Sequence, residues 1–252
     1  MDAPRTPAAF VEPKVALQLT LVVLLTLTVV KPIAGIPFLG VAAATAAAVL
    51  QLYLPIRRAE KNGGDVTWVG LHLAAWRRDV VHVLLFAAAI LPLYAIAYHL
   101  LVTRAHGVLD LFGLHELARH VPAKVFAWRW PADTAALMAG AWWLTQTVAT
   151  HLIGVALPEE TFYRGYLQPQ LEHLYPPKAR IFGVPLGKAA VIACLLFALG
   201  HYLGEWNPLR LGPFFPALAF AWLRNATGSV FGSICFHALC NVFGAVLYTL
   251  YQ

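Results

Sequence analysis

The chain has little charge and lacks the cysteine pattern of a disulfide-bonded or zinc-binding protein. Only 12% of its 252 residues are charged, against about 25% in an ordinary soluble domain, and 60% are hydrophobic. Cys194, Cys235 and Cys240 all lie in apolar runs and form no CxxC pair, so neither a disulfide framework nor a zinc ribbon is predicted. The composition predicts a polytopic membrane protein in which the cysteines are small core residues.

The sequence also lacks the signals of nucleic-acid binding and of several peptidase classes. Its net charge of +6 is spread over short loops and forms no basic stripe with interleaved aromatics, so no nucleic-acid partner is expected. The nearest approach to the zinc motif HExxH is His115 to His120, whose histidines are five residues apart and therefore lie on different helical faces. The GxSG sequence of serine intramembrane proteases and the Tyr-Asp and Gly-x-Gly-Asp pair of aspartyl ones are missing too.

Long apolar runs dominate what is present. Crossing a bilayer takes about 20 apolar residues, and we expect an all-α membrane bundle of about seven to eight helices. Without a cleavable signal or a linker, the chain is predicted to be a single integral membrane domain over residues 1–252, with the bilayer as its surroundings. Its Ala-rich and Arg-rich usage favours a multi-pass protein of a bacterial inner (plasma) membrane. The expected spans are Val15 to Val30, Ile33 to Leu54, Val80 to Val102, Thr134 to Leu157, Gly187 to Leu203, Pro213 to Leu223 and Ser229 to Tyr251.

Glu159, Glu160 and Arg164 directly follow one of these runs. A charged group at membrane depth costs about 2.5 to 3.5 kcal/mol on insertion scales, so such groups usually line a buried or water-filled site. On a helix, Glu160 and Arg164 share a face and are expected to pair, whereas Glu159 points about 100 degrees away and stays available as a general base. The alternative is a helix start at the membrane interface, where Pro158 and two acids complement the helix dipole.

Two further polar sets lie in apolar surroundings. Phe197 and His201 end one expected span, and a histidine at such a place is either a catalytic group or an ordinary interfacial residue. His237 and Asn241 lie four residues apart on one face of the last span. Such a pair can serve chemistry, or it can simply form hydrogen bonds between helices.

In this order, the three sets resemble the motifs of the CPBP family of intramembrane proteases, also called the CAAX protease and bacteriocin-processing or ABI family. Its motifs EExxxR, FxxxH and HxxxN correspond here to Glu159 to Arg164, Phe197 to His201 and His237 to Asn241. The resemblance covers a motif-bearing core of about residues 134–252. The compact size of the chain also resembles the myxosortase-like bacterial branch, which is expected to process C-terminal sorting tails.

The resemblance implies a role for each motif residue. Glu159 would be the general base, and His201 would orient the attacking water, while His237 and Asn241 would donate to the oxyanion. Glu160 and Arg164 would hold the motif helix as an ion pair, and Phe197 would shape the site. The implied activity is hydrolysis near the C-terminus of a membrane-anchored or lipidated protein substrate.

Three alternatives stay open at this point. Two histidines and a glutamate also make a zinc set, but asparagine is a poor zinc ligand and a good oxyanion donor, so we expect no cofactor and keep a zinc-dependent version as the alternative. A non-catalytic scaffold or immunity-type member would not need a free carboxylate facing a His/Asn pair. A transporter would also use intramembrane acids, but the chain shows no pair of related halves.

Overall fold

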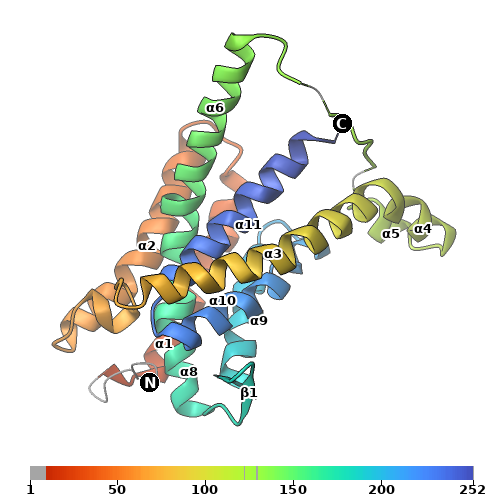
Figure 1. The fold of residues 1–252 in the computed structure, drawn as a ribbon. Coiled ribbons are helices and arrows are strands. Elements are labelled where there is room, and N and C mark those ends of the chain that lie inside the picture. Colours follow the sequence, from red (N-terminus) through yellow and green to blue (C-terminus); the bar gives the residue numbers. More distant parts are fainter. Residues whose placement is uncertain (1–9, 122, 129, 252) are drawn as a thin grey trace.

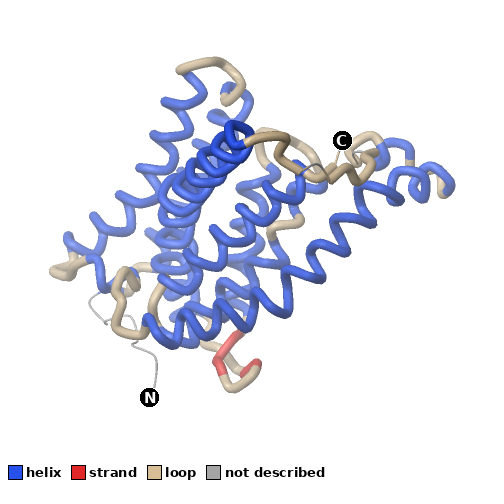
Figure 2. Tube along the Cα trace, turned by 45° about the horizontal axis from the view of Figure 1, so that its top comes forward, coloured by secondary structure: helices blue, strands red, loops and turns tan. Residues whose placement is uncertain are grey.

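A computed structural model describes residues 10–121, 123–128 and 130–251 and shows an all-α helical bundle (Figure 1). Among these residues, the only named strands are β1 (Ala179–Ile181) and β2 (Val184–Leu186), which form a short antiparallel hairpin. Figure 2 shows this hairpin, in red, at the lower edge of the bundle. The all-α fold predicted from the apolar runs is thus confirmed.

Four of the described helices are long and apolar enough to cross a membrane. The seven to eight expected spans were counted from hydropathy alone, and the structure shows why some of those segments fall short of this criterion. The runs at Gly187 and Pro213 do form helices, but these have 15 and 14 residues. The helix that begins at Thr134 carries Trp, Gln and His among its apolar residues, which lowers its hydropathy. The four candidate spans are α1 (Pro13–Ile33), α2 (Leu39–Lys61), the continuous helix Trp76–Leu111 and α11 (Phe231–Thr249).

The surfaces of these helices suit a lipid environment. Leu84, Leu85 and Leu93 on α3 (Trp76–Leu100) are each more than 60% exposed in the isolated chain. Such a large apolar surface in water would be a liability, whereas lipid tails cover it at no cost. α3 also packs along α11, and the two run side by side in Figure 1. The chain is therefore an integral membrane protein.

One helix of unusual form carries the first motif. Residues 134–174 are helical without a break, but the α-helical geometry widens twice into π-helical turns, at Thr150–Ala156 and Thr161–Leu167. Pro158 lies between the two turns and has no N–H to donate to the preceding turn, so a regular α-helix would be interrupted there. π-helical turns are rare and are frequent at functional sites. The three α-helical parts are α6 (Thr134–Ala149), α7 (Leu157–Glu160) and α8 (Gln168–Leu174).

The buried core surrounds the second of these π-helical turns. All seven residues of Thr161–Leu167 are buried, and they pack against small and aromatic residues of α9 (Lys188–Tyr202) and α10 (Phe214–Thr227). Alanines on α9 and α10 allow the helices to approach closely, as is common where helices meet in membranes. The three cysteines are free; Cys194 and Cys240 are buried in this region, as predicted, whereas Cys235 is only partly buried. The remaining short helical segments are Val66–Val69, Leu101–Ala105, α4 (His106–Leu111), α5 (His115–Ala118) and Pro208–Leu211.

Candidate active site

Glu160 and Arg164 form an ion pair in the interior of the bundle. Arg164 Nη1 donates to Glu160 Oε1 over 3.1 Å, and both side chains are fully buried. The pairing expected from their spacing of four residues is present, even though the intervening turn is π-helical. Two opposite charges that are both buried must stay paired, because either one alone would lack compensation in an apolar interior. This pair fixes the motif helix in the core.

Aromatic rings surround the guanidinium of Arg164. Its Cζ lies 4.4 Å from the ring centroid of Phe197 and 5.3 Å from that of Phe220, and Nη2 donates to the carbonyl oxygen of Ala217 over 3.4 Å. The negative faces of aromatic rings stabilise a cation that has left water. Phe197 therefore packs against the buried ion pair, and the contacts of Arg164 connect α9 and α10 to the motif helix.

His237 projects from α11 to the same pair. Its Nδ1 lies 2.8 Å from Glu160 Oε1, and because a carboxylate only accepts, Nδ1–H is the donor. The imidazole stacks on Phe220 with centroids 4.9 Å apart and planes within 13°, and it meets Phe197 edge-on at 5.8 Å. With Nδ1 committed to Glu160, Nε2 is the ring nitrogen left for other partners.

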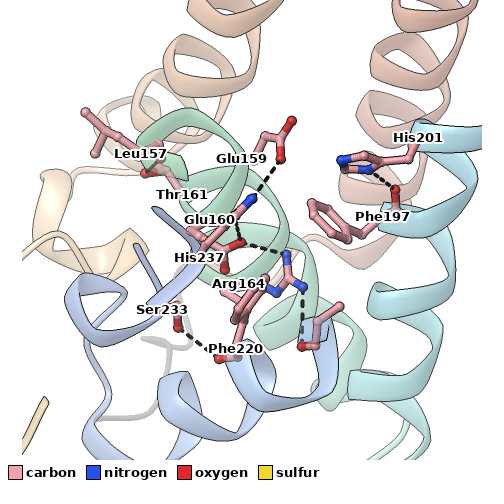
Figure 3. A network of polar contacts seen from close by, with 11 residues as sticks. Leu157, Glu159, Glu160, Thr161, Arg164, Phe197, His201, Phe220, Ser233 and His237 are labelled. Carbon is pink, nitrogen blue, oxygen red and sulfur yellow. Dashed lines mark hydrogen bonds and ion pairs between the residues drawn. The ribbon is translucent and has the colours of Figure 1, made fainter. Parts of the chain in front are cut away.

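Glu159 lies on the other side of His237. Its Oε2 is 3.8 Å from His237 Nε2, so both neighbouring glutamates reach the same imidazole (Figure 3). Glu159 Oε2 is buried and has no hydrogen-bond partner among the described residues, although the side chain as a whole is 18% exposed. A buried carboxylate oxygen without a donor is unusual in a folded protein and calls for an explanation.

His201 faces Glu159 from α9. In Figure 3 its ring points across the site toward the Glu159 side chain. Its Nδ1–H donates to the carbonyl oxygen of Phe197 over 3.1 Å, and because a carbonyl only accepts, this bond defines the tautomer. Nε2 of the neutral ring is then a free acceptor on the side of the site. The ring of His201 is thus hydrogen-bonded to the backbone of Phe197, the other motif residue of α9.

The side chain of Asn241 does not take part in this network within the described part of the chain. It lies one helical turn after His237 on α11 and is half-buried, but its side chain makes no hydrogen bond within the described part of the chain. Its place on the same helix still puts it on the His237 side of the site. The structure therefore brings Glu159, Glu160, Arg164, Phe197 and His237 into direct contact, with His201 opposite and Asn241 adjacent.

When both glutamates are ionised, the formal charges of the network sum to zero only if His237 is protonated. Glu159 and Glu160 then contribute two negative charges, and Arg164 contributes one positive charge. A protonated His237 supplies the second positive charge and gives it two N–H donors, one on Glu160 and one directed toward Glu159. An imidazolium held in this way can donate to a negative oxygen that develops beside it.

Three contacts in or beside the site could not be predicted from a local pattern in the sequence. Phe220, which stacks on His237, is one phenylalanine among many in an apolar run. The backbone carbonyl of Ala217 receives Arg164, and Lys31 from α1 donates to the carbonyl of His201. Lys31 directly precedes Pro32 in the sequence, and nothing local connects it with a residue 170 positions later.

A metal site would require a cluster of ligands. No group of three or more His, Cys, Asp or Glu side chains in the described ranges is arranged to hold a metal ion. The segment from His115 to His120 does not form a zinc site either. His115 is exposed, and its Nδ1 contacts Asp110.

One of the comparisons with known proteins finds a match. Residues 140–243 match a family model described as type II CAAX prenyl endopeptidase Rce1-like. The matched stretch contains Glu159, His201, His237 and Asn241 together with their supporting residues. No curated protein and no solved structure matches the chain. The match covers less than half of the chain and shows that residues 140–243 are similar to CAAX-type proteases of the Rce1-like family.

Proposed function

We propose that the chain is an intramembrane endopeptidase in which Glu159 activates a water molecule. The observation that carries this proposal is the buried Oε2 of Glu159, which lacks a donor and lies opposite the free Nε2 of His201. A water between them can donate one hydrogen to each acceptor, which directs its lone pair toward a substrate carbonyl. The buried ion pair with Arg164 is formed by Glu160, so it does not require Glu159.

The reaction follows from these positions. Glu159 takes a proton from the water while the water oxygen forms a bond to the carbonyl carbon, and the carbonyl electrons move to its oxygen. N–H groups of His237 and Asn241 stabilise this oxyanion. When the oxyanion collapses, the carbon–nitrogen bond breaks, and the proton held by Glu159 passes to the leaving amine. The products are a new carboxylate and a free amine, and His201 keeps the water in line throughout.

The substrate class follows from the family and the membrane setting. We propose a membrane-anchored or lipidated protein that is cut near its C-terminus, since the matched family is named for a CAAX prenyl endopeptidase. We place the enzyme in a bacterial inner membrane as a single catalytic domain. The mechanism needs no metal, because the base, the orienting histidine and the oxyanion donors all come from side chains.

The test compares protein C-termini in cells that carry the intact chain and in cells that carry Glu159→Gln. Mass spectrometry of native membranes should find precursors that keep their C-terminal tails only with the variant. Glu60→Gln is the matched control, because Glu60 is an exposed glutamate whose ion pair with Arg57 lies on the surface. Identical C-termini for the intact chain and Glu159→Gln would support the scaffold alternative.

A further inference from the structure

A group of charged residues lies beside His201, and the catalytic set does not use it. The group consists of Lys31 near the end of α1, Glu205 in the segment after α9, and Arg210 in the helical turn Pro208–Leu211. Lys31 Nζ lies 3.2 Å from Glu205 Oε1, and Arg210 Nη2 donates to the same oxygen over 2.9 Å. We call these three residues the rim cluster.

The rim cluster is joined directly to the catalytic histidine. Lys31 Nζ donates to the backbone carbonyl oxygen of His201, so the α1 lysine and the end of α9 are held together. Gly204 makes this approach feasible, because its φ is +86° and a Cβ added to it would lie 2.9 Å from Lys31 Cβ. Lys31 and Arg210 are both near enough to interact electrostatically with His201, and Lys31 also interacts with Glu159.

The rim cluster carries one positive charge in excess. Burial opposes the ionisation of Glu205, but the hydrogen bond and charge of Arg210 and the charge of Lys31 outweigh it and hold the pKa of Glu205 below its ordinary value. Glu205 is therefore ionised near neutral pH and balances only one of the two cations. Within the described part of the chain, Lys31 directs two of its three N–H donors to acceptors, which leaves one for a further anion.

The accessibility of the three residues fits a ligand that arrives from water. The side chains of Glu205 and Arg210 are 36% and 43% exposed, while that of Lys31 is 17% exposed and points inward to His201. Glu205 and Arg210 are thus more accessible to water than Lys31, which lies against the backbone of His201. A small anion that reaches Lys31 would find its remaining N–H donor beside the backbone of His201.

We propose that the rim cluster binds the C-terminal carboxylate of the substrate and so limits cleavage to bonds close to a chain end. This inference rests on the proposed function. A residue of extended chain spans about 3.3 to 3.6 Å, so a terminal carboxylate that lies a few residues beyond the cut is within reach of groups beside the catalytic water. The carboxylate only accepts hydrogen bonds and carries one negative charge, which matches the excess charge of the rim cluster.

A purely structural role for Lys31 makes a different prediction. A lysine beside the last carbonyls of a helix stabilises the helix end through its charge, whatever the substrate is. Substitution of such a lysine would disturb His201 and lower the cleavage of all substrates equally. A carboxylate-binding role instead changes the ratio between substrates that differ only at the terminal group.

The experiment uses the purified full chain and two synthetic peptides of the same sequence, each prenylated on a cysteine about four residues from the end. One peptide ends in a free carboxylate and the other in a carboxamide. We expect the kcat/KM of the wild type to be about tenfold higher for the carboxylate peptide, mainly through KM. Equal cleavage of the two peptides would overturn the inference and leave the proposed function intact, whereas failure to cleave either would overturn both.

Variants then assign the preference to the rim cluster. Lys31→Met and Arg210→Gln should each bring the ratio of kcat/KM between the carboxylate and the carboxamide peptide close to one. Lys31→Arg should keep most of this preference. Arg57→Gln is the matched control, because Arg57 also belongs to an exposed arginine–glutamate pair, on α2, and should leave the ratio unchanged. A loss of activity in Lys31→Met with the ratio preserved would show the structural role and overturn the inference.

The same assay separates a substrate carboxylate from a lipid phosphate. It is run in a neutral detergent and again with vesicles that contain phosphatidylglycerol. A carboxylate site predicts the same peptide preference in both. If anionic lipid raises the cleavage of both peptides and no preference exists without it, the rim cluster binds lipid headgroups and the inference is wrong.

Discussion

Glu159 and Glu160 are neighbours in the chain, but their carboxylates are compensated very differently. Oε1 of the fully buried Glu160 accepts from both Arg164 and His237, so its charge is matched by direct donors even though its Oε2 has none among the described residues. Glu159 has one buried oxygen without a donor and a side chain that is partly open to the site. The two residues are thus expected to differ in what they contribute, one to stability and the other to chemistry.

Replacement of each glutamate by glutamine should separate these contributions. Glu160→Gln leaves Arg164 in the interior without its ionic partner, and the expected loss of stability is about 3 to 5 kcal/mol. Glu159→Gln removes no salt bridge to Arg164 and should unfold at close to the wild-type temperature while losing activity. Thermal unfolding of the purified proteins in detergent, with Glu60→Gln as the surface control, measures both. Equal losses of stability would contradict this division.

Phe220 allows a test of the aromatic support of His237. Phe220→Leu keeps an apolar side chain but removes the ring that stacks on His237 and lies beside Arg164. The loss of aromatic and cation–π contacts should lower kcat/KM by about tenfold. Phe215→Leu on the same helix is the matched control, because Phe215 is 73% exposed. Full activity of Phe220→Leu would show that the stacking is incidental.

At the scale of the elements, Glu12 connects three segments that are far apart in the sequence. It directly precedes α1, and its carboxylate accepts hydrogen bonds from Arg58 at the end of α2 and from Tyr166 on the motif helix. Its backbone N–H donates to Gln170 Oε1. Burial opposes the ionisation of Glu12, but the hydrogen bonds from Arg58, Tyr166 and Asn62 and the charge of Arg58 together hold its pKa below the ordinary value.

This depressed pKa predicts how stability depends on pH. A carboxylate with a lowered pKa in the folded state contributes stability above its unfolded pKa, and the contribution is lost as the pH falls through the folded pKa. Glu12→Gln should therefore cost about 1 to 3 kcal/mol near neutral pH, and its difference from the wild type should shrink below about pH 4. Melting curves of both proteins over this pH range test the prediction, which a pH-independent difference would contradict.

The elements also show what could be predicted from the sequence. The ion pair between Glu160 and Arg164 follows from helical spacing, and the apolar runs predict helices because both signals are local. The meeting of both glutamates at His237 could not be predicted in this way, since it depends on how α11 packs against the motif helix. The contacts of Phe220 and Lys31 are of the same kind, because long-range packing leaves no periodic pattern in the sequence.

At the scale of the whole molecule, the proposed mechanism predicts activity without a metal. Purified enzyme treated with a chelator such as EDTA should keep its activity, because every proposed step uses a side chain of the chain itself. Added zinc should not raise the rate. A loss of activity with the chelator that only zinc restores would replace this mechanism by the zinc-dependent alternative.

The bond between Glu12 and Gln170 also bears on the order of assembly. The two residues are 158 positions apart, so α1 is made and inserted long before the helix that completes its surroundings. Contacts between residues so distant in sequence form slowly, and until then the polar end of α1 lacks its later partners. The polar end of α1 can therefore complete its hydrogen bonds only after the motif helix has been made and inserted.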